Sequence, residues 1–181
     1  MPPCWQVPKL AAMSGPQVRP EPPATAGRMA EAMPTTETQA ALLDAQGIAT
    51  RVSADEAAAD AERTRLISQS LPTLDGGAEP SMPLQPDELL HAIRRAAMLD
   101  DGHTKPPSGG TLYLTSRRLV HSGPSVREVD LAAITDAGVA LERLLLLDLT
   151  DGSELAIEVD QPRLLRVQLA AARAAARKRS A

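Results

Sequence analysis

The sequence has almost no aromatic residues and almost no cysteine. Its 181 residues include one Trp, one Tyr, one Cys and no Phe. A single Cys cannot form an internal disulfide, which argues against a disulfide-stabilised secreted fold. So few aromatic side chains exclude a base-stacking platform for single-stranded nucleic acid and an aromatic cage for a cationic ligand. We therefore expect a core built from Leu, Val, Ile, Met and Ala.

Long apolar runs and a strong charge imbalance are also missing. No stretch approaches the ~18 consecutive apolar residues that a membrane-spanning helix needs, and the N-terminus lacks the apolar segment of a signal peptide. The net charge is −4, which by itself implies no nucleic-acid partner. We expect a cytoplasmic protein with one domain and extensions, or at most two small domains.

Proline divides the chain into segments. Eight of the 16 prolines lie between Pro2 and Pro34, with almost no apolar residues that could form a buried face. Such a segment cannot offset its conformational entropy, so residues 1–34 are predicted to be a disordered Pro-rich tail. Residues 71–86 hold four more prolines and two adjacent glycines, which is typical of a linker.

Residues 35–70 carry helical signals with a thin apolar face. Thr36 with Gln39, and Ser53 with Glu56, have the spacing of capping boxes, and Gly47 is positioned to end a first helix. The segment is rich in Ala, so we expect marginal helices that are unstable alone or dock weakly.

From residue 87 onward the pattern changes to short strands with turn signals. Asp151-Gly152 is a hairpin signal, and the closing strand alternates Leu155, Ile157 and Val159 with polar or small residues, which indicates a sheet with one buried face. Helix propensity favours a helix for Asp87–Asp101, but the resemblance described below favours a strand, and we predict a strand. The other predicted strands span residues 111–115, 117–121, 126–131, 134–140, 143–149 and 154–159.

The last segment is predicted to be an amphipathic helix. Asp160 is placed to act as its N-cap and Pro162 falls in its first turn. Leu165, Leu169 and Ala172 repeat at helical spacing, so one face of this helix is expected to cover the core of the sheet.

The run GGTLYLTSRRLVHSG, Gly109–Gly123, resembles the signature hairpin of bacterial PH-like and GRAM-like domains. The matching residues are Gly110, Leu112, Leu114, Thr115, Arg118, Leu119 and Val120. The resemblance extends over roughly Leu84–Ala176. It implies a mainly β fold, in which a PH-like curled antiparallel β-barrel of about seven strands is capped by the C-terminal α-helix. The PH-like (GRAM-like) domain would span residues 87–181 and follow a disordered, partly helical N-terminal extension.

Two expectations about side chains follow from this hairpin. Tyr113 is opposite in phase to Leu112 and Leu114, so it is predicted to lie on the outer face. Arg118 is expected to bond to strand-end carbonyls or an acidic neighbour, which would make it structural.

The sequence carries no recognisable catalytic or metal-binding motif. His91, His103 and His121 are 12 and 18 residues apart with no nearby Cys, and Cys4 lies in the Pro-rich tail. There is no P-loop, no G-x-S-x-G and no dinucleotide-binding glycine motif. Asp100, Asp101 and His103 are best interpreted as a solvated loop. We expect no enzyme, no cofactor and no metal.

Binding through basic residues is the alternative that the resemblance suggests, because eukaryotic PH domains often recognise phosphoinositides near their first hairpin. The loop DDGHTKPPSGG holds two Asp and one Lys, which opposes a phosphate site. The basic C-terminus could touch an anionic membrane, but it also suits a helix C-terminus electrostatically. The candidate ligand or lipid contacts are Arg94, Arg95, Lys105, Arg117, Arg118, Arg173, Arg177, Lys178 and Arg179.

The sequence therefore favours a non-catalytic protein-interaction or scaffolding module. A protein partner or self-association is expected, because an exposed edge strand in such a barrel accepts another strand. Peripheral binding of anionic lipid or phosphoinositide is the alternative, and nucleic acid is disfavoured.

Overall fold

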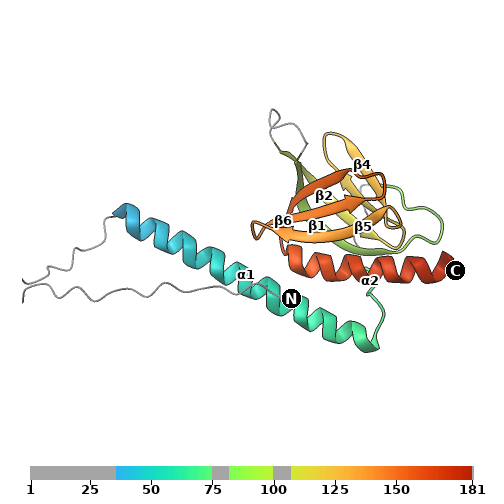
Figure 1. Cartoon of the computed structure of the whole chain (residues 1–181), viewed down its shortest axis with the longest axis horizontal. Helices are drawn as coiled ribbons and strands as arrows, with labels where there is room; N and C mark the ends of the chain where they lie inside the picture. The colour runs from blue at the N-terminus through green and yellow to red at the C-terminus, as the bar shows by residue number, and fades with distance from the viewer. Residues whose placement is uncertain (1–35, 75–81, 100–106, 181) are drawn as a thin grey trace, which may run out of the picture. The chain divides into compact units, whose positions relative to one another are not determined.

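The computed structural model describes residues 36–74, 82–99 and 107–180 (Figure 1). Four predicted segments or residues lie outside the described part of the chain: the Pro-rich tail, residues 75–81 of the linker, the Asp100–His103 loop and Lys105. The described elements are α1 (Thr36–Ser68), β1 (Leu90–Leu99), β2 (Ser108–Thr115), β3 (Arg118–Ser122), β4 (Val126–Asp130), β5 (Ile134–Ala140), β6 (Leu144–Leu149), β7 (Glu154–Val159) and α2 (Pro162–Ser180).

The seven strands form one antiparallel sheet in the order β4-β3-β2-β1-β7-β6-β5. The central strand β1 pairs with β2 along most of its length and with β7 through Ala96–Leu99. The sheet curls, and α2 lies along it (Figure 1). The predicted architecture, a curled seven-stranded antiparallel sheet followed by a helix, is confirmed.

The strand predicted within Asp87–Asp101 is also confirmed. Its sequence suits a helix, but β1 has neighbouring strands on both sides, and its Ala92, Ala96 and Met98 point into the main core. Backbone pairing on two edges and burial outweigh a helix preference of a few tenths of a kcal/mol per residue.

The main core is aliphatic, as predicted. Leu112, Leu114, Leu145 and Leu147 are among its most buried members, each at 2% exposure or less. The helix α2 contributes Leu165, Leu169 and Ala172 to the same cluster. The prediction that Leu165 and Leu169 hold the helix against the core is confirmed.

The prediction for Tyr113 is half correct. Tyr113 does lie on the face opposite the main core, but it is only 4% exposed. It packs with Met82, Leu90 and Val120 in a second, smaller cluster. The segment before β1 brings Met82 onto this face, a long-range contact that alternation within β2 could not reveal.

The interpretation of residues 35–70 as separate helices is wrong, because α1 is continuous over 33 residues. Gly47 lies inside the helix instead of ending it, and Ser53 is a helical residue instead of a cap. The C-terminal part of α1 packs against α2, with Ala59 fully buried. Tertiary packing of this kind commonly stabilises helices that are marginal alone.

The expected N-cap of α2 is a further correction. The helix begins at Pro162, and the capping carboxylate is that of Asp55 on α1. Asp55 Oδ2 accepts the N–H of Arg163 at 2.9 Å and Oδ1 accepts the N–H of Leu164 at 3.0 Å. A carboxylate more than a hundred residues away therefore satisfies two amides that Asp160 was expected to serve.

Candidate functional site

Arg118, predicted as a candidate ligand contact, is held inside a buried ion-pair network. Its Nε and Nη2 donate to Glu88 Oε1 and Oε2 at 2.9 and 3.0 Å, and its Nη1 donates to Glu128 at 2.6 Å. Thr115 supports the turn, because its Oγ1 accepts the Arg118 N–H at 2.9 Å and lies 2.6 Å from Glu88 Oε1. The structural interpretation of Arg118 is thereby supported.

The network also changes the acidity of its members. Burial alone would raise the pKa of the Glu88 carboxyl, but hydrogen bonds from Arg118, the Gln85 N–H and Thr115 lower that pKa below its usual value. The hydrogen bond that Arg118 donates to Glu88 raises the pKa of Arg118. Both members of the pair are therefore charged in the folded protein, and the two charges are paired with each other inside the network.

The other predicted cations on the sheet lie in different places. Arg94 is half-buried and donates to the Ile93 carbonyl at 3.1 Å and to Gln168 of α2 at 3.5 Å. Arg95 is exposed and borders a separate hollow of about 480 Å³ beside Gly109 and Gly110. Arg117 is exposed at the turn between β2 and β3.

The predicted cations of α2 are divided between structural and exposed positions. Arg173 donates to the carbonyls of Ile134 and Thr135 on the edge strand β5, and burial followed by repulsion from Arg177 lowers its pKa. Arg179 donates to the Ser116 carbonyl, which brings the end of α2 to the turn that carries Arg117. Arg177 and Lys178 are exposed.

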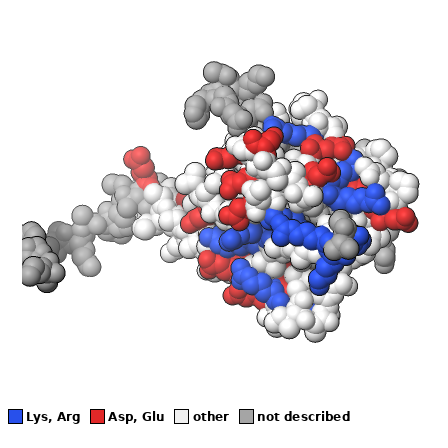
Figure 2. All heavy atoms as spheres, turned by 45° about the vertical axis from the view of Figure 1, so that its right-hand side comes forward, with Lys and Arg blue, Asp and Glu red and all other residues white. Residues whose placement is uncertain are grey.

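These cations do not form a surface of one charge sign. Figure 2 shows acidic and basic side chains on the same face of the molecule. The structure therefore brings Arg117 together with the end of α2, whereas Arg94, Arg118 and Arg173 are engaged in internal contacts.

A groove of about 730 Å³ lies beside the junction of α1 and α2 and was not predicted. We call it the α1 groove. It is bounded by α1, by the turn between β5 and β6, and by the turn between β7 and α2. Its lining residues are Ile48, Arg51, Val52, Ala54, Asp55, Leu141, Glu142, Arg143, Val159, Asp160, Gln161 and Pro162.

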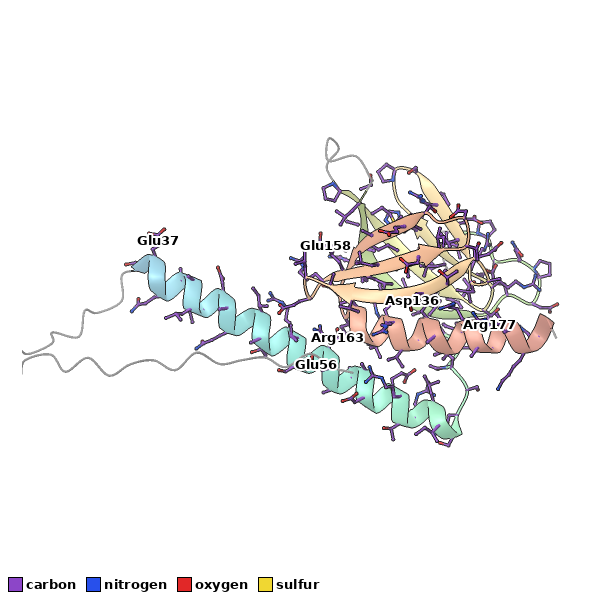
Figure 3. All side chains as sticks on the ribbon, viewed as in Figure 1. Glu37, Glu56, Asp136, Glu158, Arg163 and Arg177 are labelled. Atoms are coloured by element: carbon purple, nitrogen blue, oxygen red, sulfur yellow. The ribbon has the colours of Figure 1, made fainter. Side chains whose placement is uncertain are left out.

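The junction that forms one end of this groove is held by charge. Figure 3 labels Glu56 on α1 and Arg163 at the start of α2, which lie beside each other. Arg163 Nε is 3.4 Å from Glu56 Oε1, and Arg163 Nη1 is 3.8 Å from Asp55 Oδ2. Together with the capping by Asp55, these contacts fix the two helices at the groove.

Unusual backbone conformations gather at the α1 groove. Four described non-glycine residues have positive φ, and three of them line it: Leu141 (45°), Glu142 (62°) and Gln161 (56°). A hairpin turn with two consecutive positive φ values normally uses Asn-Gly, whereas this one uses Leu-Glu. Such strained positions cost about 1–3 kcal/mol each and concentrate at functional sites.

Leu141 is unusual in exposure as well as in backbone geometry. Leu141 is 82% exposed at the tip of the β5–β6 turn, and Ile48 across the groove is 41% exposed. Positive φ is unfavourable for leucine, and an exposed leucine gains no burial energy that would offset this cost. The contacts within the described fold therefore do not explain a leucine at this position. Violations of this kind are expected where binding requires the side chain.

Sequence reasoning missed the α1 groove because Leu141-Glu142 is not a turn signal. The groove also depends on α1 docking beside α2, which the thin apolar face of α1 did not predict. The one available clue was the absence of Gly, Asn or Asp between the two strands that flank residues 141–143.

Within the described residues, no three His, Cys, Asp or Glu side chains are arranged to hold a metal ion. His91 Nδ1 donates to the Pro72 carbonyl at 2.8 Å, and His121 is buried beside Gly110 and Gly123. None of the helices described is both long and apolar enough to cross a membrane.

No protein-family model matches the chain, and no curated protein matches it. Among solved structures, it is similar to the C-terminal domain of an unknown protein from Leishmania infantum, with 12% identity and a TM-score of 0.43 over 48% of this chain and 85% of that one. It is also similar to the N-terminal PH domain of human ARAP2, with 10% identity and a TM-score of 0.40 over 56% of this chain and 89% of that one.

Proposed function

We propose that this chain is a cytoplasmic, non-catalytic, PH-like (GRAM-like) module that binds protein through the α1 groove. The observation that carries the proposal is Leu141, an exposed leucine held at positive φ on the rim of a groove with an apolar residue, Ile48, opposite. Exposed apolar side chains around a concavity are typical of protein-binding sites.

The charge at the groove fits a partner that is largely apolar with few charges. Asp55 is occupied by the amides of α2, and Arg143 pairs with Glu158. Arg51, Glu142 and Asp160 make no ion pair with any residue that the structure describes. A partner that covers the groove must therefore present opposite charges to Arg51, Glu142 and Asp160, because burying them unpaired would be costly.

The proposal is tested by affinity purification of the full chain from its native organism with quantitative mass spectrometry. We compare the unsubstituted chain with Leu141→Asp, and use Leu146→Asp on strand β6 as the matched control, because Leu146 is exposed outside the groove. Loss of the same captured protein in Leu141→Asp alone supports the proposal. Equal capture by all three chains contradicts it.

A second substitution separates binding from folding. Leu141→Gly relieves the strain at positive φ, so we expect its Tm to be unchanged or higher while capture falls. A large fall in Tm would show that Leu141 serves the fold, which would contradict the proposed role.

Binding of anionic lipid is a second candidate, favoured by the composition of α2. This helix carries six basic residues and no acidic one, and its exposed Arg177 and Lys178 lie near the turn that carries Arg117. Co-sedimentation with vesicles containing anionic lipid should weaken with salt and with Arg117→Ala, Arg177→Ala and Lys178→Ala combined. Absence of binding at low salt removes this candidate.

A further inference from the structure

The α1 groove leaves one apolar and two charged side chains without a partner. Ile48 is 41% exposed on the wall that α1 forms. Arg51 on the same wall and Asp160 in the turn before α2 are both exposed, and neither forms an ion pair with any residue in the described part of the chain. An occupant of the groove should therefore carry an apolar, an acidic and a basic side chain.

The opposite rim of the same groove carries those three kinds of side chain in a single turn. Leu141, Glu142 and Arg143 follow one another between β5 and β6, and all three are exposed and line the groove. Within one chain Glu142 forms no ion pair with a described residue, although it lines the same groove as Arg51. The turn and the α1 wall are therefore complementary in charge, but they do not satisfy each other within one copy.

We propose that the α1 groove is occupied by the β5–β6 turn of a second copy of this chain, so that two turns interlock about a two-fold axis. This inference rests on the proposed function, because it names the partner for the same groove. A two-fold contact is reciprocal, so each copy supplies one groove and one turn. The order across the contact is α1 of the first copy, the turn of the second, the turn of the first and α1 of the second.

This arrangement explains the exposed leucine and its backbone. Leu141 of each copy packs on Ile48 of the other, and Glu142 of each copy pairs with Arg51 of the other. Burial of the leucine offsets the cost of the positive φ values of 45° and 62° in the turn. The tight turn then serves to project a leucine and a carboxylate into the second groove.

The third residue of the turn supplies the remaining charge. Arg143 pairs with Glu158 of its own chain, yet its side chain is 66% exposed. A guanidinium has five N–H donors, so it can bind a second carboxylate while it keeps the first. In the interlocked pair this second carboxylate is Asp160 of the other copy. The contact thus provides an opposite charge for each of the unpaired charges of the groove.

The second copy has room to approach the α1 wall. The part of α1 that precedes the groove extends beyond the sheet (Figure 1), and its described residues from Thr36 to Gln46 are exposed. Leu141 projects on the other side of the groove and is 82% exposed. The described elements therefore leave both the wall and the turn open to another molecule.

The experiment is sedimentation velocity of the full chain over a range of concentrations, which should show a concentration-dependent dimer. Arg51→Glu alone and Glu142→Arg alone should each raise the dimer dissociation constant about ten-fold, because the two-fold axis places the reversed contact in the interface twice. An equimolar mixture of these two variants should recover the dimer, since both contacts of the mixed pair again join opposite charges. A contact within one chain could not produce this recovery.

Asp148→Arg is the matched control, because it makes the same charge change as Glu142→Arg on an exposed residue of β6 outside the groove. It should dimerise as the unsubstituted chain does. A monomer at every soluble concentration overturns the inference, and so does a mixture that associates as weakly as the two variants do separately.

These failures are distinct from failure of the proposed function. If the chain is monomeric but Leu141→Asp still abolishes capture of a different protein, the groove binds protein and the second copy is the wrong occupant. If Leu141→Asp changes neither self-association nor capture, the groove is not the docking site and both proposals fail.

Discussion

The Arg118 guanidinium and the Glu88 carboxylate face each other through two hydrogen bonds, Nε to Oε1 at 2.9 Å and Nη2 to Oε2 at 3.0 Å. The side chains are 9% and 0% exposed. The pair ties the segment before β1 to the start of β3. Removing one member of a buried pair leaves the other charge without compensation, so this contact is expected to matter to the stability of the fold.

We expect Glu88→Gln to lower the free energy of unfolding by about 3 kcal/mol at neutral pH. Arg118 would retain Glu128, but Glu128 is half exposed and compensates less. Urea unfolding followed by circular dichroism measures the change. Glu154→Gln on the exposed side of β7 is the matched control and should change stability by less than about 0.5 kcal/mol. Equal effects of the two substitutions would contradict a structural role for the pair.

The same pair predicts a pH dependence. The folded pKa of Glu88 is below its usual value, so its contribution to stability is fully present above the unfolded pKa of about 4.3. That contribution is lost as the pH falls through the lower folded pKa. Unfolding measured between neutral pH and about pH 3 should therefore show a smaller loss of stability in Glu88→Gln than in the unsubstituted chain. Parallel curves would disprove the linkage.

The capping of α2 by Asp55 predicts a selective effect at the junction of the two helices. Asp55→Ala leaves two helix amides without their acceptor and should cost about 1–2 kcal/mol. Glu56→Ala removes a side chain that is 58% exposed and should cost less than about 0.5 kcal/mol. Hydrogen exchange of the amides of Arg163 and Leu164 should accelerate only in Asp55→Ala. Acceleration in neither variant would show that the α1 contact does not protect this helix end.

Two adjacent glycines provide a test of packing at the start of β2. A Cβ on Gly110 would collide with the Ser122 carbonyl oxygen and approach His121 Nε2 to 2.8 Å, whereas a Cβ on Gly109 meets nothing within 4 Å. Gly110→Ala should destabilise the fold by about 1–3 kcal/mol. Gly109→Ala should be neutral or stabilising by up to about 1 kcal/mol. Thermal unfolding of both variants measures the difference. Similar Tm values would contradict the close approach of Gly110 to the Ser122 carbonyl.

Two adjacent leucines on β6 test which face of the sheet carries the core. Leu145 is 0% exposed and Leu146 is 38% exposed. Leu145→Ala should cost about 2–5 kcal/mol through lost burial and the cavity left behind. Leu146→Ala should cost under about 1 kcal/mol. A larger loss for Leu146→Ala in urea unfolding would mean that the two faces are assigned in reverse.

The strands after β1, the terminal helix and the aliphatic core followed from local sequence patterns, whereas β1 was predicted from the resemblance against its own helix propensity. Alternation in residues 154–159 and the helical spacing of Leu165 and Leu169 both record which side chains are buried, and burial is what the core requires. Arg118 was correctly expected to be structural, because a turn with Thr115 places it beside strand-end groups. Its partner Glu88 could not be identified, since the pairing joins residues 30 positions apart.

The sequence shows where the candidate binding residues lie along the chain but not what their side chains contact. A count of basic residues does not show which guanidinium groups are bound within the fold. Arg173 donates to backbone carbonyls, and Arg118 pairs with carboxylates. The α1 groove was missed because it exists only where α1, Leu141 and the start of α2 meet.

The sequence by itself determined the order of elements and the aliphatic composition of the core, because period and composition are local properties of a chain. Tertiary structure decided the burial of Tyr113 and the capping of α2 by Asp55. Each depends on a contact between distant segments, whose free energy outweighs a local preference such as the capping tendency of Asp160.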